Sequence, residues 1–571
     1  MPTPIPPTSF ADLDAAVAAL QGASERLARL PISERLQLLE HAAHSLQEVE
    51  AEWVATACQA KGIDPTTPQA GEEWLGGPMV TQRNIRLLRH TLADIRDYGK
   101  PQLPDGAVKV TSRGQTTARV FPATIYDKLL YTGFSAEVWM EPGITPENLT
   151  ENMACGYRSD RPVRGKVALV LGAGNVASIG PMDVLYKLFA ENEVCILKMN
   201  PVNEYVGPFV ERAFRAMVEA DFLRVVYGGA DVGAYLCQHQ GVDTIHITGS
   251  DKTHDAIVWG PPGEERERRR AHHEPLNTKP ITSELGNVSP VIVVPGPWSE
   301  SDLAFQAANI ASMVTNNGSF NCNAAKLIVQ HSAWDARGRL MDAVETTLRS
   351  APPRVAYYPG ADSRYDSFLA AHGEAKPLGT RGNGSIPWTV IRGVDSAKHD
   401  DICFTTEAFC GVLGETALDA PDTAAFIREA VAFVNDHVWG TLNACILIHP
   451  KSLKDPTVAA AFEDAVADLR YGTVGVNHWP AVGYALGVTT WGAFPGHTVE
   501  DIRSGRGVVH NTYLFDKPQK SVIRGPFRMS PKPPWFVTNK KTHAIGPRMS
   551  AFEASPSVLK LPGIIITALM G

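Results

Sequence analysis

The stretch Asn316-Asn-Gly-Ser-Phe-Asn-Cys-Asn-Ala-Ala-Lys326 is the part of the sequence around which the rest of the chain is organised. It lies between apolar residues at helical spacing over 303–314 and the apolar run 327–329, so Cys322 is expected where a helix gives way to a strand. Backbone N–H groups at such a junction can stabilise a thiolate that attacks a carbonyl carbon. A lone cysteine is more often a small buried hydrophobe, so the surrounding segments decide its role.

Two further segments give this cysteine a context. Glu284-Leu-Gly-Asn287 lies upstream of it, and Glu407-Ala-Phe409 lies downstream. In order and spacing, the three segments resemble the active-site region of the aldehyde dehydrogenase superfamily, and the resemblance runs from about residue 20 to about residue 500. It implies an α/β fold with a Rossmann-type cofactor domain, an α/β catalytic domain that carries the thiol, and a small β oligomerisation arm. The expected boundaries are 1–100 and 160–283 for the cofactor domain, 284–485 for the catalytic domain, and 101–159 and 486–571 for the arm with a C-terminal extension.

Composition excludes several classes of protein. A chain of 571 residues is too long for one core, and 44% hydrophobic with 20% charged residues is typical of soluble globular proteins. The net charge of −8 argues against nucleic acid as a partner. The eight cysteines include no Cys-x-x-Cys pair, which predicts neither a disulfide framework nor a zinc site and favours a reducing, cytoplasmic setting. No run reaches the roughly 20 apolar residues that span a bilayer, and the apolar end, 561–571, is expected to be a terminal strand.

The α/β rhythm of residues 166–252 predicts a parallel sheet. Continuous apolar runs at 166–171, 193–198, 222–227 and 244–248 alternate with helical patterns, as in sheets covered on both faces. Helices are expected ahead of this region, and residues 101–140 alternate in the manner of strands. The resemblance assigns these strands to an arm, whose open edges need a second chain to cover them. We therefore expect a homodimer or homotetramer.

The turn Gly172-Ala-Gly-Asn-Val-Ala177 has two possible roles. It fits the dinucleotide fingerprint G-x-G-x-x-A after a strand. However, the next strand ends in Lys198 instead of an acidic residue, and Asn175 falls where the resemblance places the asparagine whose amide faces the reacting carbonyl. Asn175 is therefore expected to be an oxyanion donor, with a pyrophosphate loop or a plain turn as the alternatives.

The resemblance also places the nicotinamide cofactor, NAD or NADP. Ser250 precedes a helical pattern at 251–258, and a helix N-terminus with small residues offers its N–H groups to a pyrophosphate. Pro201 stands where NAD-preferring members commonly carry a glutamate, so a 2′-phosphate meets no repulsion there, and NADP is expected to bind within about tenfold of NAD. The residues assigned to the cofactor are Lys198, Gly228, Gly233, Gly249, Ser250, Glu407 and Phe409.

The catalytic segment departs from the family in one respect. Cys322 follows Gly318 by four positions where the family has three, while Lys326 keeps the family's spacing. Aligned without a gap, Asn321 would take the nucleophile's place, so we expect a local shift of one residue. Downstream, His478 and Trp479 are expected either to line the substrate tunnel or to pack as an ordinary pair.

The resemblance implies aldehyde oxidation through a thioester on Cys322. Asn175 would stabilise the oxyanion, the nicotinamide would take the hydride, and Glu284 would activate the water that releases the acid. If Cys322 is already ionised, Glu284→Gln predicts a single burst of reduced cofactor. Three alternatives stay open: a CoA-acylating aldehyde dehydrogenase or acyl-CoA reductase, a dinucleotide enzyme that does not use Cys322, and a non-catalytic scaffold that retains the fold. The sequence specifies an aldehyde without saying which one.

Overall fold

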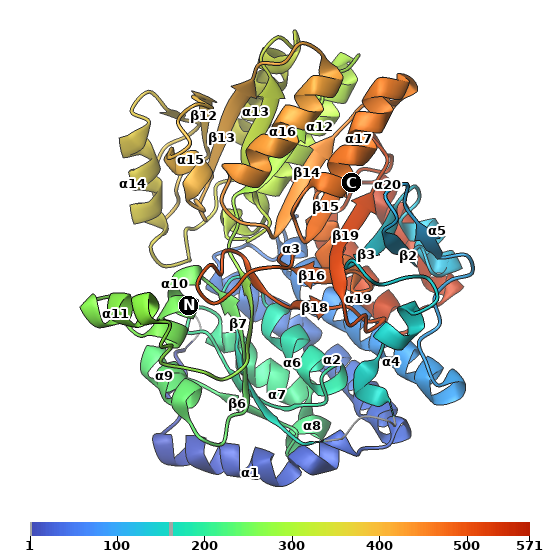
Figure 1. The fold of residues 1–571 in the computed structure, drawn as a ribbon, viewed down its shortest axis with the longest axis vertical. Coiled ribbons are helices and arrows are strands. Elements are labelled where there is room, and N and C mark those ends of the chain that lie inside the picture. The colour runs from blue at the N-terminus through green and yellow to red at the C-terminus, as the bar shows by residue number, and fades with distance from the viewer. Residues whose placement is uncertain (1–2, 159–163) are drawn as a thin grey trace.

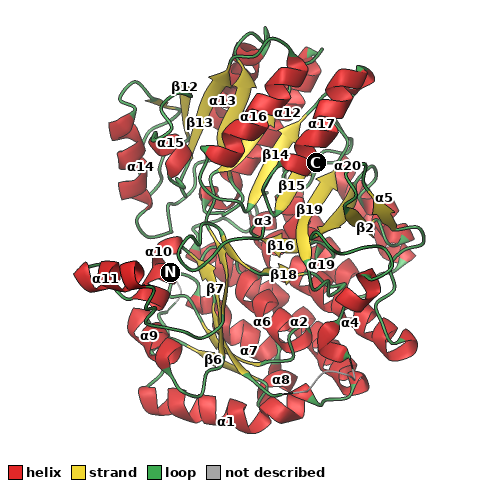
Figure 2. Ribbon diagram, viewed as in Figure 1, coloured by secondary structure: helices red, strands yellow, loops and turns green. Residues whose placement is uncertain are grey.

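The computed structural model describes residues 3–158 and 164–571, and Figure 1 shows them as two tiers, each built around a β-sheet. Figure 2 shows helices on the outer faces of both sheets. This is the α/β layering that continuous apolar strands predict, because such strands need cover on both faces.

The lower tier holds a six-stranded sheet in the order β17-β8-β7-β4-β5-β6. The strands β4 to β8 are parallel, and their order along the sheet is that of a doubly wound fold, with a switch point between β4 and β7. Ligands of such folds bind outside the carboxyl ends of the strands at this point. The strands are β4 (Val167–Leu171), β5 (Val194–Lys198), β6 (Leu223–Val226), β7 (Thr244–Gly249), β8 (Ile281–Leu285) and β17 (Gly505–Arg506).

Helices surround this sheet. Four of them precede it in the chain, as the sequence predicts: α1 (Phe10–Ala28), α2 (Ile32–Ala60), α3 (Ala70–Trp74) and α4 (Val80–Tyr98). Between α3 and α4 the chain forms a π-helical turn at Leu75–Met79, which contains Pro78 and is kinked at Gly77. The helices between the strands are α6 (Ile179–Phe189), α7 (Gly207–Ala213), α8 (Arg215–Glu219), α9 (Ala230–Gln238), α10 (Asp251–Trp259) and α11 (Glu264–His272).

The upper tier holds an eleven-stranded sheet in the order β1-β2-β3-β19-β15-β14-β9-β10-β13-β12-β11. Its centre consists of the parallel strands β15 (Thr473–Val476), β14 (Asn443–Leu447), β9 (Ser289–Val293), β10 (Ala325–His331), β13 (Val412–Leu418) and β12 (Thr389–Val394), with β11 (Lys376–Pro377) at the edge. The helices on its faces are α12 (Glu300–Thr315), α13 (Arg337–Ser350), α14 (Ala361–Ala371), α15 (Ile402–Thr405), α16 (Thr423–Asp436) and α17 (Pro456–Asp468).

The strands of residues 101–140 continue the upper sheet, while the expected domain boundaries stay a prediction. β1 (Val108–Val110), β2 (Thr116–Phe121) and β3 (Ser135–Met140) form an antiparallel run, and β3 pairs with β19 (Pro518–Arg524). Because β19 pairs in parallel with β15, the run continues the eleven-stranded sheet of the upper tier within one chain. The backbone groups on one side of the expected arm are thus paired internally, and a homodimer or homotetramer stays a prediction.

Residues 486–571 are distributed over the whole molecule. After α18 (Ala481–Leu486), the strands β16 (Thr490–Gly492) and β18 (Val508–His510) pair with each other, while β17 joins the lower sheet and β19 the upper one. The segment that follows β19 forms α19 (Thr542–Ala554), which packs against α3 and α4, and α20 (Leu561–Leu569), which packs against α19. The ring of Tyr126 in α5 (Ile125–Leu130) packs edge-on against Phe552 of α19.

The apolar C-terminus is a helix, not the strand expected from the sequence. Pro562 occupies the first turn of α20, where its missing N–H leaves no helical bond unmade. Leu561 and Ile564 of this helix are buried in a cluster with Met79 and Met549. In the part of the chain that the structure describes, no helix is both long and apolar enough to cross a membrane.

Candidate active site

Cys322 lies in a tightly coiled loop between α12 and β10. Asn317, Gly318 and Ser319 all adopt left-handed backbone conformations, with φ of 53°, 67° and 70°. The left-handed conformation costs free energy at residues other than glycine, so three in a row indicate a loop whose conformation is imposed by the surrounding protein. The coil takes up the extra residue between Gly318 and Cys322, as the expected one-residue shift requires.

The coil turns Cys322, and not Asn321, towards Glu284. The Asn321 amide donates to Asn316 Oδ1 at 3.0 Å and accepts from Asn317 Nδ2 at 3.0 Å, so its polar atoms are engaged within the loop. The Cys322 thiol lies close enough to the Glu284 carboxyl group for each group to shift the pKa of the other. The structure therefore brings together the two residues that the sequence proposes as nucleophile and base.

Burial raises the pKa of both members of the Cys322–Glu284 pair, so each group keeps its proton to a higher pH than in water. Burial raises the pKa of Glu284 to about 8, helped by the nearby charges of Asp183 and Glu407. Burial and the charge of Glu284 raise the pKa of the Cys322 thiol well above its ordinary value. Such a coupled pair titrates as a unit, and a carboxylate of this pKa is a suitable base near neutral pH.

Glu284 is held in position by strand β17 and the residue before it, Ser504. At the end of β8, Glu284 pairs with Gly505 of β17, and Leu285 N donates to Ser504 O at 2.9 Å. Gly505 has φ +113°, and a side chain there would stand 2.0 Å from the Ser283 carbonyl oxygen. Only glycine permits this approach. The Glu284 atom Oε1 is buried without a hydrogen-bond partner, so one oxygen is available to a reactant.

Asn175 lies beside the cysteine loop. Its Nδ2 donates to Phe320 O at 2.9 Å, two residues before Cys322. A carboxamide nitrogen carries two N–H groups, so a second donor is left for an oxyanion. The first turn itself is filled by protein, because a side chain at Gly174 would stand 2.7 Å from Asn200 Oδ1. The fingerprint Gly172–Ala177 thus has no room for a pyrophosphate at Gly174.

A buried polar cluster that sequence reasoning missed holds Asn175 in place. The backbone oxygen of Asn175 accepts from Lys61 Nζ at 3.1 Å, from Tyr357 Oη at 3.0 Å and from Asn317 Nδ2 at 2.9 Å. Lys61 also pairs with Glu73 at 2.8 Å. No local motif around Lys61 or Tyr357 marks this role, because the contacts join segments more than a hundred residues apart.

Lys326 holds the loop from its far side. Its Nζ donates to Asn321 O at 3.1 Å, Cys322 O at 3.2 Å and Ala324 O at 3.1 Å, and it pairs with Glu407 at 3.1 Å. The sequence marks Lys326 only as a spacing landmark. Glu407, expected at the nicotinamide ribose, is thus tied to the nucleophile's loop.

The two residues that follow Leu285, Gly286 and Asn287, connect Glu284 to the upper sheet in different ways. A side chain at Gly286 would stand 2.0 Å from Glu407 Oε2, so glycine is required there. Asn287, by contrast, is fully buried and donates to Asn443 O at 2.8 Å and Ser289 Oγ at 3.1 Å. The Asn287 amide therefore links the chain just before β9 to strand β14.

Five of the seven residues assigned to the cofactor lie at the carboxyl edge of the lower sheet, and Glu407 and Phe409 lie between α15 and β13 of the upper tier. Lys198 ends β5, Gly228 and Gly233 flank the start of α9, and Gly249 and Ser250 end β7 and open α10. Gly249 and Ser250 are exposed, and a side chain added at Gly249 would meet only Ile247, at 3.6 Å. The open turn after β7, unlike the filled first turn, fits a dinucleotide phosphate at a helix N-terminus.

Phe409 and Lys198 have contacts that bear on this assignment. Phe409 has φ +42°, and its ring packs against Phe320 and Tyr358 with Arg364 over it. Burial lowers the pKa of Lys198, opposed by the charges of Asp231 and Glu204. The two carboxylates are a feature that the sequence reading, centred on Pro201, did not find.

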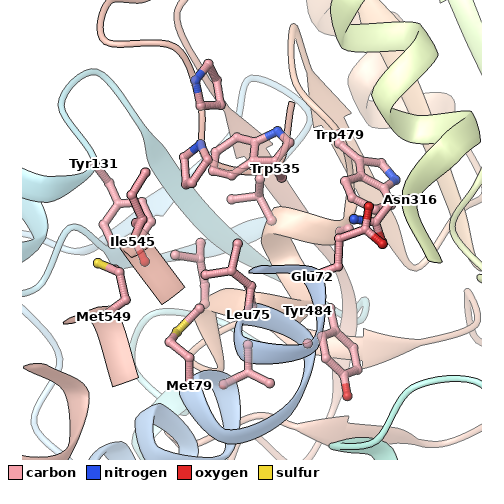
Figure 3. Close-up of a pocket in the computed structure, with 18 of the residues that line it drawn as sticks. Glu72, Leu75, Met79, Tyr131, Asn316, Trp479, Tyr484, Trp535, Ile545 and Met549 are labelled. Carbon is pink, nitrogen blue, oxygen red and sulfur yellow. The ribbon is translucent and has the colours of Figure 1, made fainter. Parts of the chain in front are cut away.

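A cavity of about 590 Å³ opens onto Cys322. Its lining includes Asn316, Trp479 and Tyr484 on one side and Tyr131, Trp535 and Met549 on the other, as Figure 3 shows. Of the pair proposed from the sequence, Trp479 lines this cavity, and its Nε1 donates to Asn323 O at 2.7 Å. His478 is buried against Phe134 and Trp535 instead. Trp479 therefore lies at the cavity, as expected of a tunnel wall, whereas His478 packs in the protein interior.

Two other cysteines have contacts of their own. Cys410 is fully buried in the hydrophobic core, in agreement with a packing role. Cys403 lies with His372 and Asp401 so that one ligand atom from each falls within 4.8 Å of the others, a juxtaposition absent from the sequence pattern. Asp401 Oδ1 already accepts from Cys403 N at 2.9 Å and lies 3.0 Å from His372 Nε2. These bonds account for the group as the cap of α15.

Comparison with known proteins gives one family. The family model described as "Aldehyde dehydrogenase family" matches residues 161–356. The 4-trimethylaminobutyraldehyde dehydrogenase of Bos taurus is 32% identical over 122 residues, which are 21% of each chain. The N-succinylglutamate 5-semialdehyde dehydrogenase of Sphingopyxis alaskensis is 29% identical over 275 residues, 47% of this chain and 51% of that one. The chain thus spans between a fifth and about half of the length of the curated relatives it matches.

Solved structures resemble the whole fold. The NADP-dependent glyceraldehyde-3-phosphate dehydrogenase of Bacillus halodurans, complexed with NADP, has a TM-score of 0.60 at 17% identity, covering 91% of this chain and 92% of that one. The NAD-dependent aldehyde dehydrogenase of Sinorhizobium meliloti has a TM-score of 0.60 at 17% identity, covering 92% and 89%. At these identities the likeness establishes the fold alone.

Proposed function

Because this chain belongs to the aldehyde dehydrogenase superfamily, we propose that it oxidises an aldehyde to the carboxylic acid with NAD or NADP as the hydride acceptor. The observation that carries this proposal is that the Cys322 thiol, which lines the cavity, lies close enough to the buried Glu284 carboxyl group for each group to shift the pKa of the other. A cysteine beside a buried carboxylate provides both a nucleophile and the base that activates it.

The first step forms a bond between Cys322 Sγ and the carbonyl carbon. Glu284 takes the thiol proton as the sulfur attacks, and the carbonyl oxygen becomes an alkoxide. The second N–H of Asn175 Nδ2 and the backbone N–H of Cys322 are the proposed donors to this oxygen. The cluster around Lys61 fixes the Asn175 backbone, so this donor needs no reorganisation during the reaction.

The bound nicotinamide would supply the acceptor that removes hydride from the thiohemiacetal carbon and leaves a thioester on Cys322. Glu284 then gives its proton to solvent and accepts one from water. The resulting hydroxide attacks the thioester carbon, the bond to Cys322 Sγ breaks, and the carboxylic acid leaves. The unpartnered Glu284 Oε1 is the oxygen proposed to hold that water.

The chain offers residues that fit the dinucleotide. Gly249 and Ser250 would hold the pyrophosphate at the N-terminus of α10, and Lys198, Gly228 and Gly233 would lie along the adenosine side. Glu407 and Phe409 would lie at the nicotinamide ribose and ring. The solved structures named above are complexed with NADP or described as NAD-dependent, which supports this choice of cofactor.

The test compares two cysteines. Cys322→Ala should abolish aldehyde-dependent reduction of NAD or NADP, whereas Cys410→Ala, in the core, should retain most of it when the protein is folded. Full activity of the Cys322 variant refutes the proposal. A wild type that stalls without coenzyme A and turns over rapidly with it would instead establish the acylating alternative, and a wild type that binds neither cofactor would favour the scaffold.

A further inference from the structure

We propose that the aldehyde carries an elongated, uncharged apolar chain, and that the C-terminal extension after β19, residues 525–571, forms the wall against which this chain packs. The inference rests on the proposed function and names its substrate class. Three observations carry it: the size and lining of the cavity, the pairing of the charges around it, and the attachment of the extension.

The cavity is too large for a small aldehyde alone. Its volume of about 590 Å³ lies within the range of sites that enclose drug-sized ligands, roughly 300–1,000 Å³. Leu75 and Met79 of the π-helical turn form one side, and Trp535, Ile545, Met549 and Ile564 of the extension form another. Figure 3 shows Leu75, Met79, Trp535, Ile545 and Met549 converging on the same space. Apolar walls from two ends of the chain favour an apolar occupant.

The charged groups beside the cysteine loop, at the inner end of the cavity, are already matched within the protein. Lys61 pairs with Glu73 at 2.8 Å, and Glu72 pairs with Arg354 at 2.6 Å. Near the extension, Arg528 pairs with Asp302 at 3.4 Å and Lys532 Nζ donates to Thr538 O at 3.0 Å. A charged substrate would have to be desolvated without a free counter-charge at the inner end, and that is costly.

The extension is fixed in position, and the cavity opens beside it. The buried carboxylate of Glu553 in α19 binds Arg83 and Arg86 of α4, and so fastens the extension to the N-terminal helices. Leu129 of α5 and Ile565 of α20 line the cavity and are 51% and 40% exposed. The opening therefore lies between α5 and α20, and Cys322 lies at the inner end.

Binding of non-reacting probes tests the inference without any turnover. Primary n-alkan-1-ols of increasing length are titrated into the full-length protein, and the fluorescence of Trp479 and Trp535, which line the cavity, reports binding. Each added methylene should lower the Kd by about fourfold until the cavity is filled. A Kd that does not change with chain length overturns the inference.

A matched pair of variants localises the chain to the extension. Ala568→Trp, on the lining face of α20, should raise the Kd of decan-1-ol at least tenfold and leave that of butan-1-ol within twofold. Leu569→Trp, the next residue along, is 65% exposed and does not line the cavity, so it should change neither. Equal effects of the two variants overturn the assignment of the wall.

Turnover distinguishes this inference from the proposed function. The kcat/KM of n-alkanals should rise with length and exceed that of the equally long aldehyde with a terminal carboxylate. A preference for the carboxylated aldehyde, or for acetaldehyde, refutes the substrate class and leaves the oxidation intact. Length-dependent binding of alkanols with no oxidation of any aldehyde supports the apolar site and refutes the proposed function instead.

Discussion

Arg83 Nη1 donates to Glu553 Oε1 at 2.8 Å, which joins helix α4 to helix α19 across 470 residues of sequence. Both side chains are buried, and Arg86 Nε donates to the second oxygen of Glu553 at 2.9 Å. Asp127 lies 3.4 Å from Arg83 on the side of α5. The extension is therefore attached to the body of the protein by ionic contacts to the fully buried carboxylate of Glu553.

Glu553→Ala should lower the free energy of unfolding by about 3–5 kcal/mol, because it leaves the buried guanidinium of Arg83 without its main partner. Urea unfolding measures this loss. Glu463→Ala removes an exposed partner of Arg524 and should cost no more than about 1 kcal/mol. Similar losses in the two variants would show that the buried pair is not what fastens the extension.

Glu284→Gln should slow acylation as well as deacylation at neutral pH. The sequence predicts a burst if Cys322 is ionised, but in the structure burial raises the pKa of this thiol, and Glu284 is the proposed acceptor of its proton. Rapid mixing with aldehyde and cofactor should show a burst that is slow near pH 7 and accelerates at higher pH, where the thiol ionises alone. A fast burst near neutral pH would mean that Cys322 is ionised without Glu284.

In the wild type, kcat/KM should rise with pH as the Cys322–Glu284 pair loses a proton, with an apparent pKa near the value of about 8 that burial gives Glu284. Glu284 can act as a base only when it is deprotonated, so kcat/KM is expected to be low at low pH. The pH profile of kcat/KM measures this. A flat profile from about pH 6 to 9 would contradict the assignment of Glu284 as the base.

Glu284 also makes the stability of the protein depend on pH. Its pKa is about 8 in the folded protein against an ordinary value of 4.5, so between these values the folded state holds a proton that the unfolded chain has released. Stability from this group is therefore present at low pH and is lost as pH rises through about 8. Relative to the wild type, Glu284→Gln should gain stability on the order of a few kcal/mol between about pH 5 and pH 9. Denaturant unfolding of both proteins at about pH 5 and pH 9 measures this gain. A difference in the free energy of unfolding between variant and wild type that is the same at both pH values would refute the prediction.

Asp231→Asn should shift cofactor choice towards NADP. The charge of Asp231 acts on Lys198 at the expected adenosine ribose, where it would repel a 2′-phosphate. We expect NADP affinity to rise by up to about tenfold relative to NAD, or ~1.4 kcal/mol, in binding titrations. Glu219→Gln at the end of α8 is the control and should leave the ratio unchanged. An unchanged ratio in both variants would mean that Asp231 does not face the cofactor.

The sequence by itself determined the elements whose cause is local. Apolar runs such as 166–171 and 193–198 gave buried parallel strands, and the small residues at 249–250 gave an open turn before a helix, because these patterns depend on neighbouring residues alone. The closeness of Cys322 and Glu284 was implied by the family resemblance in the order and spacing of the motifs, although Glu284 lies in β8 and Cys322 in the loop before β10.

Only the tertiary structure decided features that depend on distant partners. The run 561–571 has the β-branched residues of a strand, but it forms a helix whose Leu561 and Ile564 pack in an apolar cluster with Met79 and Met549. The hairpin of 108–140 joined the catalytic sheet because β19 supplied the backbone partners. The cluster around Lys61 and the apolar wall of the cavity likewise combine segments hundreds of residues apart. Burial and long-range pairing set these choices, and neither is encoded in the spacing of adjacent residues.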